Sequence, residues 1–84
     1  MRLSSFEWDD ANVAHIVRHN VTPEEVEEAF QGRHQIRRSI ASRYTLLARS
    51  AAGRYLMIAF ILRAGTVRTI TARDMTSAER RRYS

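Results

Sequence analysis

The sequence predicts an α+β fold with two N-terminal helices, an antiparallel β-sheet meander of about four strands and a C-terminal helix. Two capped helical patterns fill the first third of the chain, and a strand-like period begins near His34. A further capping signal at Thr76 precedes the last helix. Because no low-complexity linker divides the 84 residues, we expect a single domain over residues 1–84.

The first helix is predicted by a capping residue and an apolar pattern. Residues 6–8 form a short extended segment, and the Asp9 carboxylate that follows can cap a helix over residues 10–19. Asn20 stands where many helices end in a left-handed residue, a conformation that Asn tolerates. The apolar side of this helix is expected to include Ala14, Ile16 and Val17.

The second helix has the clearest local signal in the chain. Thr22 is an N-cap, Pro23 suits the first helical position, and Glu25 closes a capping box with Thr22. The helix should stop near Gly32. Its inward residues are predicted to be Val26, Ala29 and Phe30. We interpret the rest of its surface as a solvated acidic face, with a partner-binding surface as the alternative. That face carries Glu24, Glu25, Glu27 and Glu28.

The sheet is predicted by strand-like periods that follow the second helix. The expected strands cover residues 35–40, Arg43–Arg49, 54–63 and Thr66–Asp74. A hairpin connection ending in Gly53 joins the second of them to the third. The third strand is apolar on both sides, so we place it at the centre of the sheet. The C-terminal helix follows Thr76, whose capping box uses Glu79.

Charge divides the sequence into an acidic and a basic part. Up to Glu28 the chain has two arginines and seven carboxylates, a net charge of −5; from Ala29 onward it has twelve arginines and two carboxylates, a net charge of +10. A stretch this basic suits a polyanion, and nucleic acid is the commonest soluble one. All fourteen cationic residues are arginine, which suits RNA phosphates, although a genomic codon bias would give the same count.

Several kinds of site are excluded by what the sequence lacks. Without cysteine, the chain can form neither a disulfide nor a thiolate metal site. His15 and His19 have a metal-ligand spacing, but no glutamate of the zinc-protease pattern accompanies them, so we expect no metal site and no cofactor. The longest apolar run, residues 55–62, is too short to span a membrane, so we expect a cytoplasmic protein that acts without a membrane.

Strand alternation predicts a basic cleft on the less covered face of the sheet. In the last strand, Ile70 and Ala72 are expected to face the core. The opposite face then carries Thr69, Thr71 and Arg73. Because Arg49 belongs to the outward series of its own strand, Arg49 and Arg73 are predicted to converge and to stabilise charge on a phosphate. The alternative is a pair of ordinary strand-edge arginines.

Cleavage of RNA at such a cleft without a metal needs a general base for the ribose 2′-hydroxyl and an acid for the leaving oxygen. His34, at the start of the sheet, is one candidate, because the unperturbed titration range of histidine suits either role. Glu79 and Tyr83 on the last helix can supply a second group. Each has a structural alternative: His34 as a loop residue, Glu79 as a capping partner and Tyr83 as a packing residue. Substrate phosphates are expected to bind Arg43, Arg54, Arg68 and Arg80.

Three segments resemble one family when they are taken in order. They are FEWD at residues 6–9, HIxRHNVTPEEVEE at residues 15–28 and ITARDMT at residues 70–76. In these motifs the chain is similar to the BrnT family of type II toxin–antitoxin toxins, which are small ribonucleases of RelE-like fold. Arg49 and Arg73 match positions that recur in that family.

The resemblance implies a ribonuclease that cuts RNA without a metal cofactor and arrests growth when it is free. It also implies silencing by a DNA-binding antitoxin of the BrnA kind, whose complex represses its own operon and can form a heterotetramer around an antitoxin dimer. The chain lacks lysine, which many RelE-like toxins use in the active cleft, so the resemblance leaves the proton-moving residue open. Two other readings stay open: a non-enzymatic nucleic-acid-binding domain and a subunit that only docks a partner.

Overall fold

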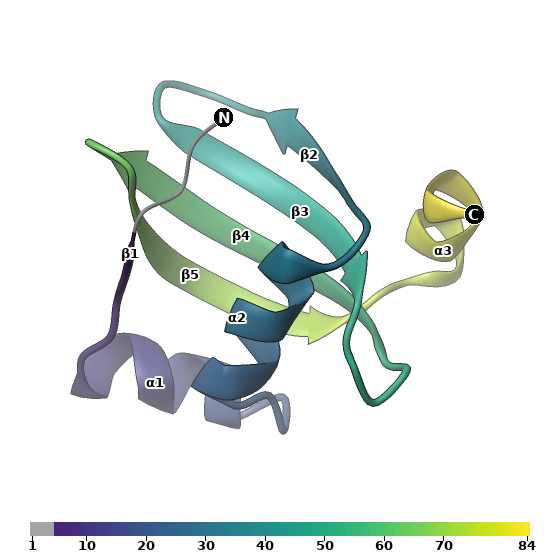
Figure 1. Cartoon of the computed structure of the whole chain (residues 1–84), viewed down its shortest axis with the longest axis horizontal. Helices are drawn as coiled ribbons and strands as arrows, with labels where there is room; N and C mark the ends of the chain where they lie inside the picture. Colours follow the sequence, from purple (N-terminus) through teal and green to yellow (C-terminus); the bar gives the residue numbers. More distant parts are fainter. Residues whose placement is uncertain (1–4) are drawn as a thin grey trace.

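The computed structural model describes residues 5–84, which form three helices and a five-stranded mixed sheet. In chain order the elements are β1 (Ser5–Glu7), α1 (Asp10–Val17), α2 (Pro23–Gln31), β2 (His34–Arg38), β3 (Arg43–Arg49), β4 (Tyr55–Arg63), β5 (Thr66–Asp74) and α3 (Ser77–Tyr83). The strands lie in the order β1-β5-β4-β3-β2, so β4 is central, as its apolar pattern predicts (Figure 1). The α+β class and the order of the helices are confirmed.

The sheet differs from the predicted four-stranded antiparallel meander by one strand. Residues 5–7 form β1, which pairs in parallel with β5 and sets Phe6 beside Val67. The other four strands are antiparallel neighbours. The prediction of a purely antiparallel sheet is therefore wrong, because β1 and its partner lie far apart in the sequence and no local pattern encodes their pairing.

Helix α1 begins as predicted but buries a different face. Asp9 caps it, and its carboxylate accepts a hydrogen bond from the Asn12 backbone N–H at 3.0 Å. Ile16 is fully buried, but Ala14 is exposed and Val17 is 53% exposed, so the predicted apolar side is wrong for these two residues. Asn12 is buried instead, because its side-chain amide donates to the Glu7 carbonyl at 2.8 Å.

Helix α2 confirms the predicted capping box and inward face. Thr22 and Glu25 each bond the backbone N–H of the other, at 3.1 and 3.2 Å. Val26 and Ala29 are fully buried, and the Phe30 ring packs edge to face against Phe60 with centroids 5.0 Å apart. Burying each large apolar side chain of this kind contributes about 1.5–3 kcal/mol. Asn20, before the helix, has a φ of 58°, which confirms the predicted left-handed residue.

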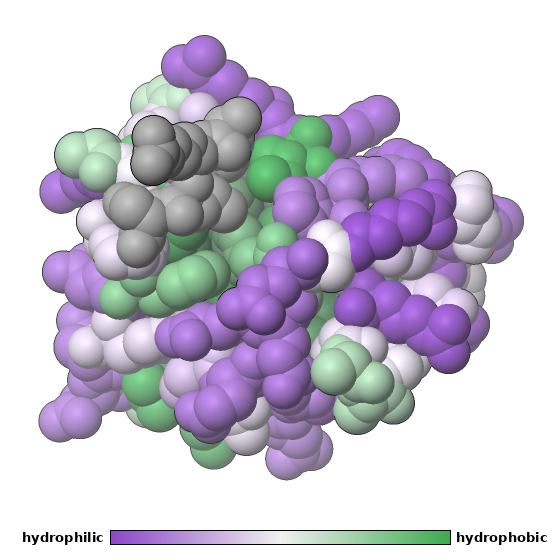
Figure 2. Space-filling view, in the orientation of Figure 1, coloured by the Kyte–Doolittle hydropathy of each residue, from purple (hydrophilic) through white to green (hydrophobic). Residues whose placement is uncertain are grey.

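The two faces of the sheet are unlike. One face, which we call the covered face, packs with α1 and α2 in the main core, through Leu46, Ala48, Leu56, Ile58, Phe60, Val67 and Ala72. The opposite face, the open face, is covered by α3 at one end only, where Met75 and Tyr83 cluster with Leu47 and Met57. Figure 1 shows α2 crossing the strands and α3 lying past the end at which β3 and β5 finish. The side seen in Figure 2 is mostly hydrophilic, with smaller apolar areas between the polar ones.

Two local features of the sheet depart from the predicted strands. The register of β5 against β4 shifts at a bulge, so that Ile70 has no opposite residue between Thr69 and Thr71. Thr69 is therefore buried and Ile70 partly exposed, which reverses the prediction for both, whereas Ala72 is buried as expected. The predicted strand over residues 35–40 ends at Arg38, because the chain turns there and leaves Ile40 79% exposed.

No helix in the described part of the chain is long and apolar enough to cross a membrane.

Candidate active site

A shallow cleft of about 400 Å³ lies on the open face beside α3. We call it the α3 cleft. Its wall and floor come from strands β2 to β5 and from α3, and include Arg37, Thr45, Ala59, Arg73, Glu79 and Arg82. The floor includes Met57 and the small residues Thr45 and Ala59, which are directly opposite each other in the register of β3 and β4. Polar side chains at its edges can therefore reach a molecule that rests on the sheet.

The central feature of the α3 cleft is a two-pronged ion pair between Arg73 and Glu79. The Arg73 guanidinium donates to both Glu79 carboxylate oxygens, at 2.8 and 3.1 Å, and to the Asp74 carbonyl at 3.0 Å. The carboxylate also accepts from the Thr76 backbone N–H at 2.9 Å, which completes the capping box of α3. Glu79 therefore has two roles that the sequence presented as alternatives: it caps a helix and it faces the cleft.

The ion pair fixes the charge state of its carboxylate. The hydrogen bond from Arg73 lowers the pKa of Glu79, and burial opposes that shift only in part. The same hydrogen bond raises the pKa of Arg73. At neutral pH the cleft therefore holds an ionised carboxylate against a permanent cation.

Arginines outnumber the carboxylate in the α3 cleft. Arg37, Arg38 and Arg82 line it in addition to Arg73, against the single acid Glu79. Arg37 and Arg82 form no ion pair with any residue in the range 5–84. Because these two guanidinium groups are exposed and unneutralised, the cleft attracts anions, and their forked N–H groups match phosphate oxygens.

Arg49 shares the open face with Arg73 but does not line the α3 cleft. It pairs in register with Tyr55, whereas Arg73 pairs with Met57. Its Nε donates to the Gly53 carbonyl at 3.2 Å, and its guanidinium lies over the Tyr55 ring at 5.1 Å. The predicted convergence of Arg49 with Arg73 is therefore limited to a common face, with Tyr55 next to Arg49.

The structure places His34 and Tyr83 outside the α3 cleft. His34 pairs with Ala48 of the covered face, its Nδ1 lies 2.9 Å from the Gly32 carbonyl, and its ring is 6.4 Å from Phe30. Tyr83 is 5% exposed, and its hydroxyl donates to the Arg33 carbonyl at 3.0 Å. Of the three proton-transfer candidates from the sequence, only Glu79 faces the cleft.

The four arginines predicted to bind substrate occupy different environments. Arg54 is a structural clamp, because it bonds the carboxylates of Glu25 and Asp74 at 3.1 and 3.0 Å and the Asn20 carbonyl at 2.6 Å. The other three arginines, Arg68, Arg80 and Arg43, each have different neighbours. Arg68 pairs with Glu7 and Asp9, Arg80 lies 4.1 Å from the centre of the Tyr55 ring, and Arg43 is exposed opposite Ile61.

Sequence reasoning missed Arg37 and Arg82 as cleft residues. A signal exists for both. Arg82 follows Glu79 by three positions, which places the two side chains on neighbouring parts of one helix face. Arg37 lies opposite Thr45 once β2 is paired with β3, and Thr45 belongs to the outward series. Within residues 5–84, no group of three or more His, Asp or Glu side chains is arranged to hold a metal ion.

Comparison with known proteins gives a family. No curated protein matches the sequence. Residues 8–79, which include β2 to β5 and both members of the Arg73–Glu79 pair, match the family model described as "Ribonuclease toxin, BrnT, of type II toxin-antitoxin system". Since the match covers most of the chain, this protein belongs to the BrnT family of ribonuclease toxins of type II toxin–antitoxin systems.

Proposed function

We propose that this toxin cleaves RNA in the α3 cleft as an endoribonuclease that needs no metal cofactor, and that cleavage of cytoplasmic RNA inhibits translation and growth. One observation carries the proposal: the Arg73–Glu79 pair holds an ionised carboxylate and a phosphate-binding cation side by side at the edge of a basic cleft. Family membership supports the ribonuclease activity in general.

The proposed step is attack of a ribose 2′-oxygen on the adjacent phosphorus. The 2′-hydroxyl proton passes to the Glu79 carboxylate, the new phosphorus–oxygen bond closes a 2′,3′-cyclic phosphate, and the bond to the 5′-oxygen breaks. That leaving oxygen takes a proton from water. A general base of this kind accelerates such a reaction by about 10²–10⁴-fold.

Arg73 is proposed to stabilise the charge that builds on the phosphate during this step. Its three hydrogen bonds to Glu79 and Asp74 use three of the five guanidinium N–H groups, so donors remain for a phosphate oxygen. Contact with Glu79 keeps the base and the cation in fixed relative positions. Arg37 and Arg82 then bind phosphates on either side of the reacting one.

The test compares wild-type toxin with Glu79→Gln on a labelled single-stranded RNA in EDTA. Glutamine can keep the capping box of α3 but cannot act as a base. We expect wild-type cleavage, and a fall in kcat of about 10²-fold or more in the variant with a similar melting temperature. Arg18→Ala, an exposed residue at the end of α1, is the matched control. Cleavage by Glu79→Gln at the wild-type rate would remove Glu79 as the base, and intact RNA with wild-type toxin, with or without ribosomes, would remove the metal-free reaction.

Inhibition is proposed to work by covering the α3 cleft. A type II toxin has an antitoxin protein as its partner, and we propose a BrnA-like DNA-binding antitoxin that assembles with the toxin as a heterotetramer. An acidic or amphipathic segment of the antitoxin would pair with the unneutralised arginines of the cleft. Amide exchange of the toxin alone and in the complex tests this: protection confined to α2, with β3 and β5 unchanged, would contradict it.

A second candidate is a toxin copy that binds RNA without cutting it. The specific observation in its favour is that His34 and Tyr83 lie outside the α3 cleft, so the cleft lacks a histidine or tyrosine that could act as the acid. Such a protein would bind RNA with a strong dependence on salt and leave it intact.

A further inference from the structure

We propose that single-stranded RNA continues from the α3 cleft along the open face toward the turn between β4 and β5, and that Arg43 and Arg63 bind its phosphates there. This inference rests on the proposed function, because it takes RNA as the molecule bound in the α3 cleft. It adds a second binding region, remote from the Arg73–Glu79 pair. We call this region the RNA track; its residues are Thr45, Ala59, Thr71, Arg43, Ile61 and Arg63.

The strand register places the RNA track in rows that follow one another away from α3. Beyond the row that contains Arg73 and Met57 comes a row of small side chains, Thr45, Ala59 and Thr71. The next row has Arg43, Ile61 and Arg68 side by side on β3, β4 and β5. Arg63, opposite Thr66, ends the series beside the turn. Because neighbouring rows on one face are two residues apart along a strand, each step covers about 7 Å.

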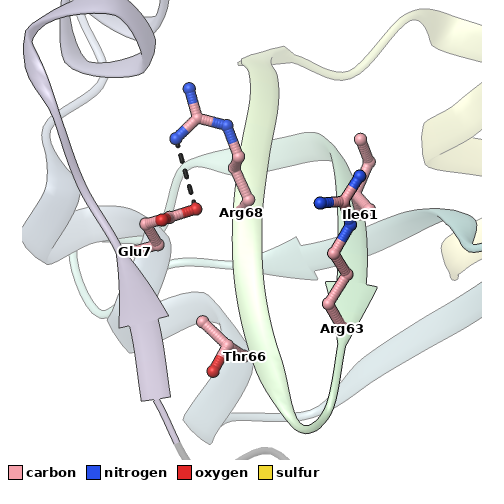
Figure 3. Close-up of a pocket in the computed structure, with 5 residues that line it drawn as sticks. All are labelled: Glu7, Ile61, Arg63, Thr66 and Arg68. Carbon is pink, nitrogen blue, oxygen red and sulfur yellow. Dashed lines mark hydrogen bonds and ion pairs between the residues drawn. The ribbon is translucent and has the colours of Figure 1, made fainter.

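A second hollow lies at the far end of these rows. It has a volume of about 410 Å³ and is lined by Glu7, Ile61, Arg63, Thr66 and Arg68 (Figure 3). Figure 3 shows the Arg63 side chain beside Ile61, and Arg68 turned away toward Glu7. Ala59, on the floor of the α3 cleft, is only two residues from Ile61 on β4. The two hollows are therefore consecutive along one strand of the open face.

Charge complementarity identifies the occupant as a polyanion. Arg43 and Arg63 are exposed and form no ion pair within residues 5–84, so their guanidinium groups are available. Arg68 differs, because Asp9 and Glu7 hold it at 2.7 and 3.3 Å. Cations at both ends of a floor of small residues suit a chain with a charge on every unit, and the exposed side of Ile61 gives apolar surface for a ribose or base.

Single-stranded RNA fits this surface better than an acidic protein segment does. The free cations recur from Arg37 and Arg82 at the α3 cleft to Arg43 and Arg63 at the turn, as the phosphates of a nucleic acid recur. Apart from Ile61, the middle of the RNA track offers only small polar or apolar side chains, and no large apolar pocket that would anchor a protein. Binding there should be insensitive to base sequence.

The experiment measures binding of uncleavable RNA, so that it does not depend on catalysis. Fluorescence anisotropy compares 2′-O-methyl oligonucleotides of three and twelve nucleotides on wild-type toxin, on Arg43→Ala/Arg63→Ala and on the control Arg18→Ala. For single strands each lost phosphate contact reduces the salt slope by about 0.7, so we expect the double variant to have a slope shallower by about 1.4 on the longer RNA. Between about 50 and about 200 mM salt, the wild type should lose about sevenfold more affinity than the double variant.

Each outcome is decisive for the RNA track. A shallower slope on the twelve-nucleotide RNA alone, with Arg18→Ala like the wild type, supports it. Equal slopes for the wild type and the double variant overturn it, as does equal affinity of the wild type for the two lengths. Loss of antitoxin binding in the double variant with unchanged RNA binding would also overturn it, because it would assign this surface to the protein partner. Cleavage of an unmodified three-nucleotide RNA by wild-type toxin tests the proposed function separately.

Discussion

Arg54, the residue before β4, and the unpaired arginines of the open face use the same side chain in opposite ways. Arg54 has several acceptors around it: it bonds Glu25, Asp74 and the carbonyls of His19 and Asn20, which follow α1. On the open face, Arg37, Arg43 and Arg63 have no acidic partner in the described range. Arg73 stands between these extremes, since it is paired but keeps N–H groups free. The number of acceptors around an arginine, rather than its position on a strand, therefore separates a structural cation from one that is available to an anion.

The largest expected effect is that of replacing Arg73, which we propose binds the reacting phosphate. In Arg73→Ala we expect kcat for RNA cleavage to fall by about 10²–10³-fold and growth arrest to be lost, because the charge that we propose stabilises the reacting phosphate is removed. Arg49→Ala should have a smaller effect, since Arg49 lies outside the α3 cleft. Cleavage rates and colony counts after induction, with thermal melting of each variant, give the measurement. Full toxicity of Arg73→Ala would show that the site lies elsewhere.

The next effect concerns the contribution of Arg54 to stability. Arg54→Ala should lower the free energy of unfolding by about 2 kcal/mol, because several charged or carbonyl acceptors lose their donor at once. Arg37→Ala, a change of the same charge, should alter stability by about 0.5 kcal/mol or less, since Arg37 is exposed and has no ion pair. Urea unfolding at neutral pH compares the two. Equal losses of stability would show that the acceptors around Arg54 do not stabilise the fold.

Low pH should weaken the ion pair between Arg73 and Glu79. The folded-state pKa of Glu79 lies below its ordinary value of 4.5. The ion pair therefore contributes fully to stability above pH 4.5, and this contribution is lost as the pH falls through the folded-state pKa. We expect about 1 kcal/mol or less from this partly exposed pair. Between pH 6 and pH 3, the free energy of unfolding should therefore fall less for Glu79→Gln than for the wild type. Asp9, whose pKa the hydrogen bond from Arg68 lowers, is present in both proteins and therefore contributes equally to the two.

The smallest effect concerns the turn at which the open face ends. Ala64 and Gly65 both have positive φ, 49° and 81°, so the β4–β5 turn has the form that favours Asn-Gly. Ala64→Asn should raise stability by about 0.5–1 kcal/mol, because alanine is strained in the left-handed region. Thermal melting measures it, and RNA binding should be unchanged, since only the turn residue differs. A lower melting temperature would show that Ala64 is not strained.

Local signals in the sequence predicted much of this fold. Capping residues such as Asp9 and Thr22 fixed the starts of the helices, because each bonds a backbone group three residues away. The parallel pairing of β1 escaped prediction because its contacts join opposite ends of the chain. The same limit applies to the candidate site: Arg73 and Glu79 were both identified, but their direct contact depends on how α3 folds back, and the position of His34 on the covered face depends on the pairing of β2 with β3.

The bulge at Ile70 decides which face of the sheet Arg73 reaches. Arg68 and Arg73 are five positions apart, an odd number, so a regular strand would turn one of them to each face. With Ile70 unpaired, both arginines lie on the open face, opposite Ile61 and Met57. The presence of an extra residue at position 70, rather than the side chain it carries, therefore places Arg68 and Arg73 on the same face. Substitutions there should be tolerated, whereas deletion of that one residue would reverse the parity of the strand and turn either Arg68 or Arg73 toward the core.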